Sequence, residues 1–113
     1  MDCLFCRILK GEIPSTKVFE NEWVYAFRDI NPQAPVHVLV IPKEHIPGAD
    51  GITVANSAAV AHVFEAIPVI AAGEGLTSGY RVITNCGEDG CQSVRHLHFH
   101  LLGGKKLPEN MGE

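Results

Sequence analysis

The chain has 113 residues and a mass of 12.3 kDa, and we expect residues 1–113 to form one domain, because domains of about 100–150 residues are the commonest. Hydrophobic residues make up 46% of it, which is enough to build a core and argues against a disordered tail. Acidic residues outnumber basic ones by 13 to 9, and the net charge of −4 disfavours nucleic acid or an anionic membrane as a partner. No apolar run approaches the ~20 residues of a membrane span, and Asp2 stands where a signal peptide would carry basic residues. We therefore expect a soluble cytoplasmic protein.

The elements of the first half are a short helix at 3–10 and strands at 17–20, 23–28 and 36–41. Gly11 ends the helix, and a polar turn separates the first two strands, which are rich in aromatic and β-branched residues. Two prolines make 29–35 a loop, and Pro42 stops the third strand.

In the second half of the chain, the apolar residues change from the spacing of a strand to that of a helix. Apolar residues at Val60, Val63, Phe64 and Ile67 predict an amphipathic helix over 54–72, which Pro68 is expected to kink or end. Strands follow at 79–85 and 94–102. The order predicts an α+β fold: an antiparallel sheet of about five strands with one long helix and a short N-terminal helix.

The four cysteines form two groups. Cys3 and Cys6 have the C-x-x-C spacing that, in a chain with no export signal, indicates a metal site, with two cysteines packed in the core or a redox pair as the alternatives. The redox alternative expects this motif after a strand in a βαβ unit, which the N-terminus does not offer. Cys86 and Cys91 are expected to pack as small apolar residues outside any metal site.

Three histidines alternate with apolar residues near the C-terminus. On a strand, His96, His98 and His100 share one face, while the intervening residues face the core. The first and third lie roughly 13 Å apart at ~3.3 Å per residue, which is too far for one metal with Zn–N bonds of ~2.0–2.1 Å. They must therefore divide their roles. His37 could face the same cleft, and a neutral imidazole can act as a nucleophile or a general base.

The segment His96-Leu97-His98-Phe99-His100-Leu101-Leu102 resembles the motif of the histidine triad (HIT) superfamily. Residues 29–37 and 92–94 resemble flanking signatures of its Hint-like branch, and the similarity extends from Cys3 to Gly104. The resemblance implies a hydrolase or transferase that cleaves the AMP–N bond of purine nucleoside phosphoramidates through a covalent nucleotidyl-histidine. The alternatives are a nucleotide-binding regulatory module with little turnover and, disfavoured by the 13 Å separation, a zinc hydrolase.

The resemblance also implies a role for each matched residue. The catalytic residues would be the nucleophile His98, the phosphoryl-oxygen ligand His100, the supporting His37, and Ser93 at the leaving group. The substrate-binding residues would include His98, His100 and Ser93. Asp29 would contact the ribose, Ile30 the base, and Asn85 the phosphate or leaving group. Cys91 departs from the family pattern, which has glycine or alanine at that position.

A bacterial zinc-bearing subgroup shares the N-terminal C-x-x-C. That resemblance implies a structural zinc on Cys3, Cys6, His45 and His96. It further implies a homodimer whose sheets join into one larger sheet.

Overall fold

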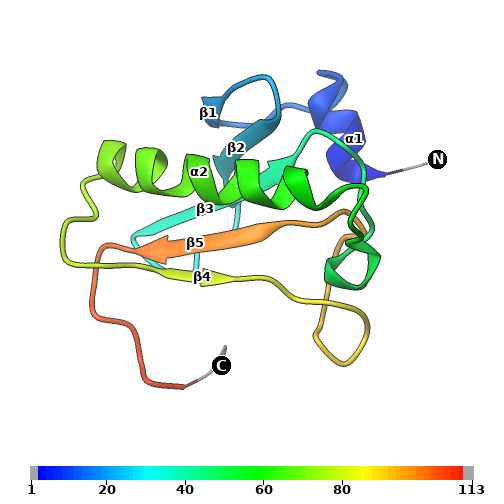
Figure 1. Cartoon of the computed structure of the whole chain (residues 1–113). Coiled ribbons are helices and arrows are strands. Elements are labelled where there is room, and N and C mark those ends of the chain that lie inside the picture. The colour runs from blue at the N-terminus through cyan, green and yellow to red at the C-terminus, as the bar shows by residue number, and fades with distance from the viewer. Residues whose placement is uncertain (1–2, 111–113) are drawn as a thin grey trace.

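The computed structural model describes residues 3–110 and contains one antiparallel five-stranded sheet with the strand order β1-β2-β3-β5-β4 (Figure 1). The elements are α1 (Leu4–Leu9), β1 (Lys17–Glu20), β2 (Val24–Arg28), β3 (Val36–Pro42), a 3-10 turn (Ala49–Gly51), α2 (Ser57–Gly73), β4 (Arg81–Ile83) and β5 (Phe99–Gly103). The predicted α+β fold, with one long helix and a short N-terminal one, is confirmed. No helix within residues 3–110 is both long and apolar enough to cross a membrane.

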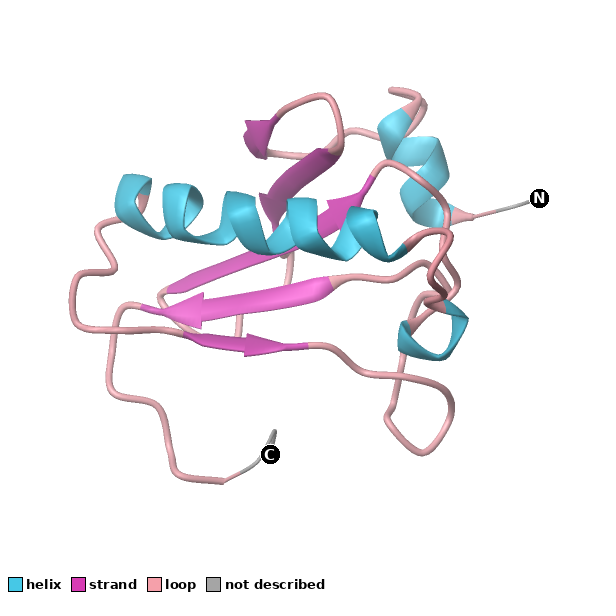
Figure 2. Ribbon diagram, viewed as in Figure 1, coloured by secondary structure: helices cyan, strands magenta, loops and turns pink. Residues whose placement is uncertain are grey.

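Helix α2 covers one face of the sheet, lying mainly against β3 and β2 (Figure 2). Its buried residues recur with helical spacing and are Val63, Ala66, Ile67, Ile70 and Ala71. Pro68 lies inside the helix, so the expectation that it could end the helix was wrong. Both Pro68 and Phe64, four residues earlier, face solvent, where water can satisfy the carbonyl that the proline leaves without a helical donor.

The opposite face of the sheet packs against α1. Along β3, Val38 and Val40 belong to the core under α2, whereas Leu39 and Ile41 join Phe5 of α1 in a second apolar cluster. The same alternation places Phe99 and Leu101 of β5 under α2. Histidines at the other positions of β3 and β5 therefore face away from α2.

The last two strands are shorter than predicted. β4 pairs with β5 only from Arg81 opposite Leu102 to Ile83 opposite His100. Beyond this point the Thr84 hydroxyl donates to the carbonyl of His98 at 2.8 Å, and that side-chain bond replaces the next step of the ladder. His96 and His98 consequently precede β5 instead of lying within it.

The turn between β1 and β2 is tied to α2 by an aromatic stack. The rings of Trp23 and His62 are parallel, with centroids 4.0 Å apart and an angle of 6° between their planes. Nδ1 of His62 also lies 2.9 Å from a carboxylate oxygen of Glu65.

Candidate active site and metal cluster

Three histidines meet on the sheet face opposite α2. His37 of β3 and His100 of β5 are diagonal neighbours, because His37 pairs with Leu102 and His100 with Leu39. Nε2 of His37 lies 2.9 Å from Nδ1 of His100. The ring of His98 packs against that of His100 with centroids 5.1 Å apart.

The hydrogen bonds fix where the protons of the His37–His100 pair lie. The backbone N–H of Gln33 donates to Nδ1 of His37 at 3.0 Å, so this nitrogen is an acceptor. His37 therefore holds its proton on Nε2 and donates it to Nδ1 of His100. The neutral His100 ring is left with a proton on Nε2, which makes that edge a hydrogen-bond donor.

His98 has the opposite arrangement. Its Nδ1 lies 2.8 Å from the carbonyl oxygen of His96 and must be the donor, since a carbonyl can only accept. The lone pair of His98 is therefore on Nε2. The ring is 2% exposed and is wedged between His100 and the Phe5 ring of α1, whose centroid is 5.1 Å away.

Burial keeps the His37–His100 pair neutral. Burial and, to a smaller extent, the neighbouring His98 and His37 rings together lower the pKa of His100 to about 4, with partial opposition from Asp29. Burial also lowers the pKa of His37, against the attraction of the Asp29 carboxylate 3.4 Å from Nε2. Both rings are uncharged at neutral pH, as their hydrogen bonds require.

Two cavities lie beside these residues, one lined by Asp29 and the other by His37 and His100. One, of about 370 Å³, lies between α1 and β2; it is largely apolar, with Phe5, Phe27 and Leu39 in its wall and Asp29 beside Ile30 at its edge. Ile30 is fully exposed there. The other cavity, of about 310 Å³, is polar, and its wall includes His37, His100, Asn85, Gln33, Arg81 and Lys105.

His98 lines neither cavity, but its ring contacts Phe5 in the wall of one and His100 in the wall of the other. The structure thus brings together His37, His98, His100 and Asp29, and it places Asn85 beside them. Ser93 is exposed and lines neither cavity.

Gln33, Arg81 and Lys105 were not predicted as members of the site. Gln33 acts through its backbone amide, which no side-chain pattern can reveal. Arg81 and Lys105 are isolated cations in the sequence, and only the pairing of β4 with β5 brings them to the cavity.

Cys91 does not pack as an apolar residue, so that prediction was wrong: it is exposed, and Cys86 is half-buried. Cys91 has φ of +60°, and the amides of Cys91 and Gln92 donate to the carbonyls of Glu88 and Gly87, both at 3.0 Å. This pair of bonds is that of a Schellman turn, whose left-handed position is usually a glycine.

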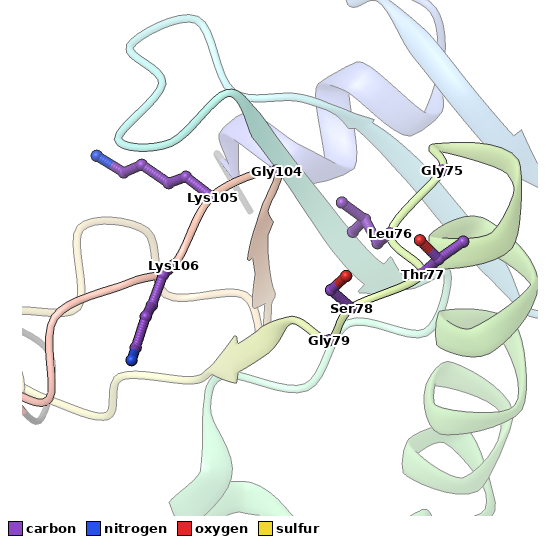
Figure 3. A pocket seen from close by; sticks show the side chains of 8 residues that line it. All are labelled: Gly75, Leu76, Thr77, Ser78, Gly79, Gly104, Lys105 and Lys106. Atoms are coloured by element: carbon purple, nitrogen blue, oxygen red, sulfur yellow. The ribbon is translucent and has the colours of Figure 1, made fainter.

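A further cavity, of about 590 Å³, opens where the loop after α2 meets the end of β5 (Figure 3). Its wall includes Thr77, Ser78, Lys105 and Lys106. Lys105 is the one residue that it shares with the histidine-lined cavity. The side chains of Lys105 and Lys106 point in different directions (Figure 3).

Cys3, Cys6, His45 and His96 form a separate cluster, in which all four candidate ligand atoms lie within 4.8 Å of one another. Nδ1 of His96 is 3.5 Å from Sγ of Cys3, 3.6 Å from Sγ of Cys6 and 3.1 Å from Nδ1 of His45. A tetrahedral zinc with the usual bond lengths separates its ligands by roughly 3.3–3.8 Å. Nε2 of His96 donates to the carbonyl of Pro42 at 2.9 Å, which leaves Nδ1 free to bind a metal. The donor set and its geometry therefore fit zinc.

Asp29, His37 and His100 also lie close enough to hold a metal. A metal on Nε2 of His37 would shift the proton of that ring to Nδ1, where the Gln33 amide already donates. This cluster is therefore built for a hydrogen-bonded pair of imidazoles and not for a cation.

Comparisons of the sequence and the structure with known proteins agree on one family. The model of the HIT domain matches residues 10–107. A protein of Zea mays named "14 kDa zinc-binding protein" is 50% identical over 110 residues, covering 92% of this chain and 83% of its own length. The adenylylsulfatase HINT1 of Arabidopsis thaliana is 44% identical over 110 residues, covering 92% of this chain and 72% of its own length.

A solved structure extends the likeness to three dimensions. A HIT family hydrolase from Clostridium thermocellum superposes with a TM-score of 0.94 at 47% identity, covering 97% of this chain and 96% of its own. The match spans the sheet, both helices and the triad. The chain belongs to the HIT domain family.

Proposed function

We propose that this HIT protein hydrolyses purine nucleoside 5′-phosphoramidates, with His98 as the nucleophile. The observation that carries the proposal is the bond from Nδ1 of His98 to the His96 carbonyl, which leaves the Nε2 lone pair available for attack. The same carbonyl dipole stabilises the positive charge that the ring acquires once Nε2 has formed a bond to phosphorus.

The reaction has two displacements. In the first, Nε2 of His98 forms a bond to the α-phosphorus, the P–N bond to the leaving amine breaks, and the amine nitrogen takes up a proton from solvent. In the second, water attacks the same phosphorus, the bond to His98 breaks, and the proton released by water returns to solvent. The products are AMP and the free amine, and His98 regains its neutral form.

His100 and His37 stabilise charge on the phosphoryl group. Because His100 accepts from His37 through Nδ1, its Nε2–H can donate to a phosphoryl oxygen. His37 is a positioning residue, since the Gln33 amide sets its tautomer and His37 in turn sets that of His100.

The apolar cavity between α1 and β2 supports the assignment of the nucleoside to that side. One oxygen of Asp29 accepts from the backbone amide of Asn31 at 2.8 Å, which holds the carboxylate in place to accept from the two ribose hydroxyls. Ile30 presents an exposed apolar side chain that a base would cover. Asn85 in the polar cavity would contact the phosphate or the leaving group. Ser93 lines neither cavity, and its proposed donation to the leaving nitrogen rests on the family resemblance alone.

The metal that we assign to Cys3, Cys6, His45 and His96 is zinc, as the name of the Zea mays relative also suggests. Four protein ligands fill a tetrahedral site, so the ion supplies cross-linking and not a position for substrate. Thiolate ligands persist in a reducing compartment, and we therefore place the protein in the cytoplasm.

We also propose that the protein is a homodimer joined through β4. Within residues 3–110 this strand lies at the edge of the sheet, and one row of its backbone groups has no neighbouring strand. Phe64 of α2 and Tyr80 before β4 are 48% and 43% exposed and would be covered by the second chain. A symmetric pairing of the two β4 strands would produce one continuous sheet.

The second candidate function is a nucleotide-binding module with little turnover, and the 2% exposure of His98 favours it. Mass spectrometry of a rapidly quenched reaction with adenosine 5′-phosphoramidate separates the two. We expect release of AMP and an adenylyl adduct on the peptide that contains His98. Bound but unchanged substrate, with no adduct, would instead establish the binding module.

A further inference from the structure

The apolar cavity between α1 and β2 contains a half-buried hydroxyl, that of Ser15, to which the reaction described above gives no role. The polar side chains among the residues of its wall are those of Ser15, Thr16, Arg28 and Asp29. Asp29 is already assigned to the ribose. The Arg28 guanidinium donates to the Glu74 carboxylate at 2.7 and 3.0 Å, at the end of α2 and therefore on the other face of the sheet. Of the two remaining hydroxyls, that of Thr16 belongs to an exposed residue.

The Ser15 hydroxyl is held from behind by a tyrosine. Its Oγ lies 2.6 Å from Oη of Tyr25, a residue of β2 that does not line the cavity. The Tyr25 ring packs against Phe27 with centroids 5.7 Å apart, and Phe27 packs edge-on against Phe5 with centroids 5.6 Å apart. Both phenylalanines are in the wall of the cavity. The three rings therefore fix the position of the phenol, and the phenol fixes that of the Ser15 hydroxyl.

The chemistry of the two hydroxyls sets the direction of the bond between them. A phenol is a stronger hydrogen-bond donor than an aliphatic alcohol and a weaker acceptor, so Tyr25 donates to Oγ of Ser15. The proton of the Ser15 hydroxyl is not used in this bond and can point into the cavity. The mostly apolar wall thus presents a donor whose position is set before any ligand binds.

We infer that Ser15, positioned by Tyr25, donates a hydrogen bond to a ring nitrogen of adenine and selects the base. The inference rests on the proposed function, which puts the base in this cavity and the ribose at Asp29. Adenine has lone pairs in the ring plane at N1, N3 and N7. An apolar wall alone accepts any flat ring, whereas a fixed donor favours a ring with an acceptor at that point and is left unsatisfied by a ring without one.

The test measures, by calorimetry on the purified protein, the dissociation constants of AMP and of its 1-deaza, 3-deaza and 7-deaza analogues. Each analogue replaces one ring nitrogen by C–H. Ser15→Ala should weaken the binding of AMP about three- to tenfold, the range of one neutral hydrogen bond. The analogue that lacks the accepting nitrogen should bind the wild type more weakly than AMP does, and Ser15→Ala should not weaken it further.

Three further variants locate the effect. Thr16→Val removes the other hydroxyl of the wall; it is the matched control and should bind all four nucleotides as the wild type does. Ser15→Thr keeps the hydroxyl and should retain most of the affinity for AMP. Tyr25→Phe keeps the ring but no longer orients Ser15, so it should lose part of the affinity for AMP and none for the analogue that lacks the acceptor.

The outcomes separate this role of Ser15 from the proposed function. An equal loss for AMP and all three analogues in Ser15→Ala would show that the hydroxyl acts on packing or on the ribose, and it would overturn the inference. Unchanged AMP affinity in that variant, or a loss of the same size in Thr16→Val, would overturn it as well. AMP has no P–N bond to cleave, so these results do not depend on turnover. A wild type that fails to hydrolyse adenosine 5′-phosphoramidate but shows the dependence on Ser15 removes the proposed function and leaves the base contact standing.

Discussion

His96 holds His98 in place through its backbone while its own side chain belongs to the metal cluster. The His96 carbonyl accepts the Nδ1 proton of His98 at 2.8 Å, and Nδ1 of His96 lies 3.1–3.6 Å from the other three candidate ligand atoms. A metal bound by the side chain of His96 would therefore also fix the carbonyl that sets the tautomer of His98.

The first prediction concerns the nucleophile. His98→Ala should lower the single-turnover rate with adenosine 5′-phosphoramidate by at least about a thousandfold, because removal of a nucleophile leaves only the binding contributions to catalysis. The affinity for AMP, measured by calorimetry, should change little. A variant that keeps the wild-type rate would remove His98 from this role.

The second prediction concerns the metal. Elemental analysis should find about one zinc per chain, and Cys3→Ser/Cys6→Ser should lose it and show a lower Tm, because metal binding contributes directly to folding. Turnover should fall only indirectly, because His98 is held less firmly once the metal is lost. Loss of turnover on chelation with an unchanged Tm would instead indicate a catalytic ion and overturn the structural assignment.

The third prediction concerns Cys91. At φ of +60°, glycine lacks the steric cost that a Cβ imposes, so Cys91→Gly should raise the free energy of unfolding by about 1 kcal/mol. Cys91→Ala is the matched control: it removes the thiol but keeps the Cβ and should give no such gain. Urea denaturation measures both. Equal stabilisation by the two variants would assign the effect to the thiol and not to the backbone.

The fourth prediction concerns pH. The pKa of His100 falls from 6.5 to about 4 on folding, so the folded state favours the neutral ring. The stability contributed by this residue is complete above pH 6.5 and is lost as the pH falls from 6.5 towards 4. The free energy of unfolding should therefore decline less steeply over this interval in His100→Gln than in the wild type. Parallel curves for the two proteins would show that His100 titrates normally.

The fifth prediction concerns assembly. Light scattering at micromolar concentration should give about 25 kDa, twice the 12.3 kDa of one chain. Phe64→Glu should give the monomer, since it puts a charge on the apolar surface that the partner would cover. A wild-type mass near that of one chain would refute the proposed dimer.

The sequence predicted the sheet and both helices because the spacing of apolar residues, which can be read directly from the sequence, differs between strands and helices. It did not predict that β5 starts only at Phe99, because the Thr84 bond to the His98 carbonyl joins residues distant in the chain. It left open whether Pro68 would kink or end α2, since that depends on which side of the helix faces water.

The candidate site was likewise predicted only in part from the sequence. The triad motif and the C-x-x-C spacing pointed to the histidines and cysteines that the fold brings together. The proton positions depend on the Gln33 amide and the His96 carbonyl, which are backbone groups that every residue carries. The cations Arg81 and Lys105 reach the polar cavity only through the pairing of β4 with β5.

The stack of Trp23 on His62 gives the molecule an internal optical reporter. The sequence contains a single tryptophan, so its emission comes from one known place, the contact between the β1–β2 turn and α2. Undocking of this turn would separate the rings and change the emission without any added label. The order in which the turn and the metal cluster come apart during unfolding can therefore be followed in the unmodified protein, by fluorescence for one and zinc release for the other.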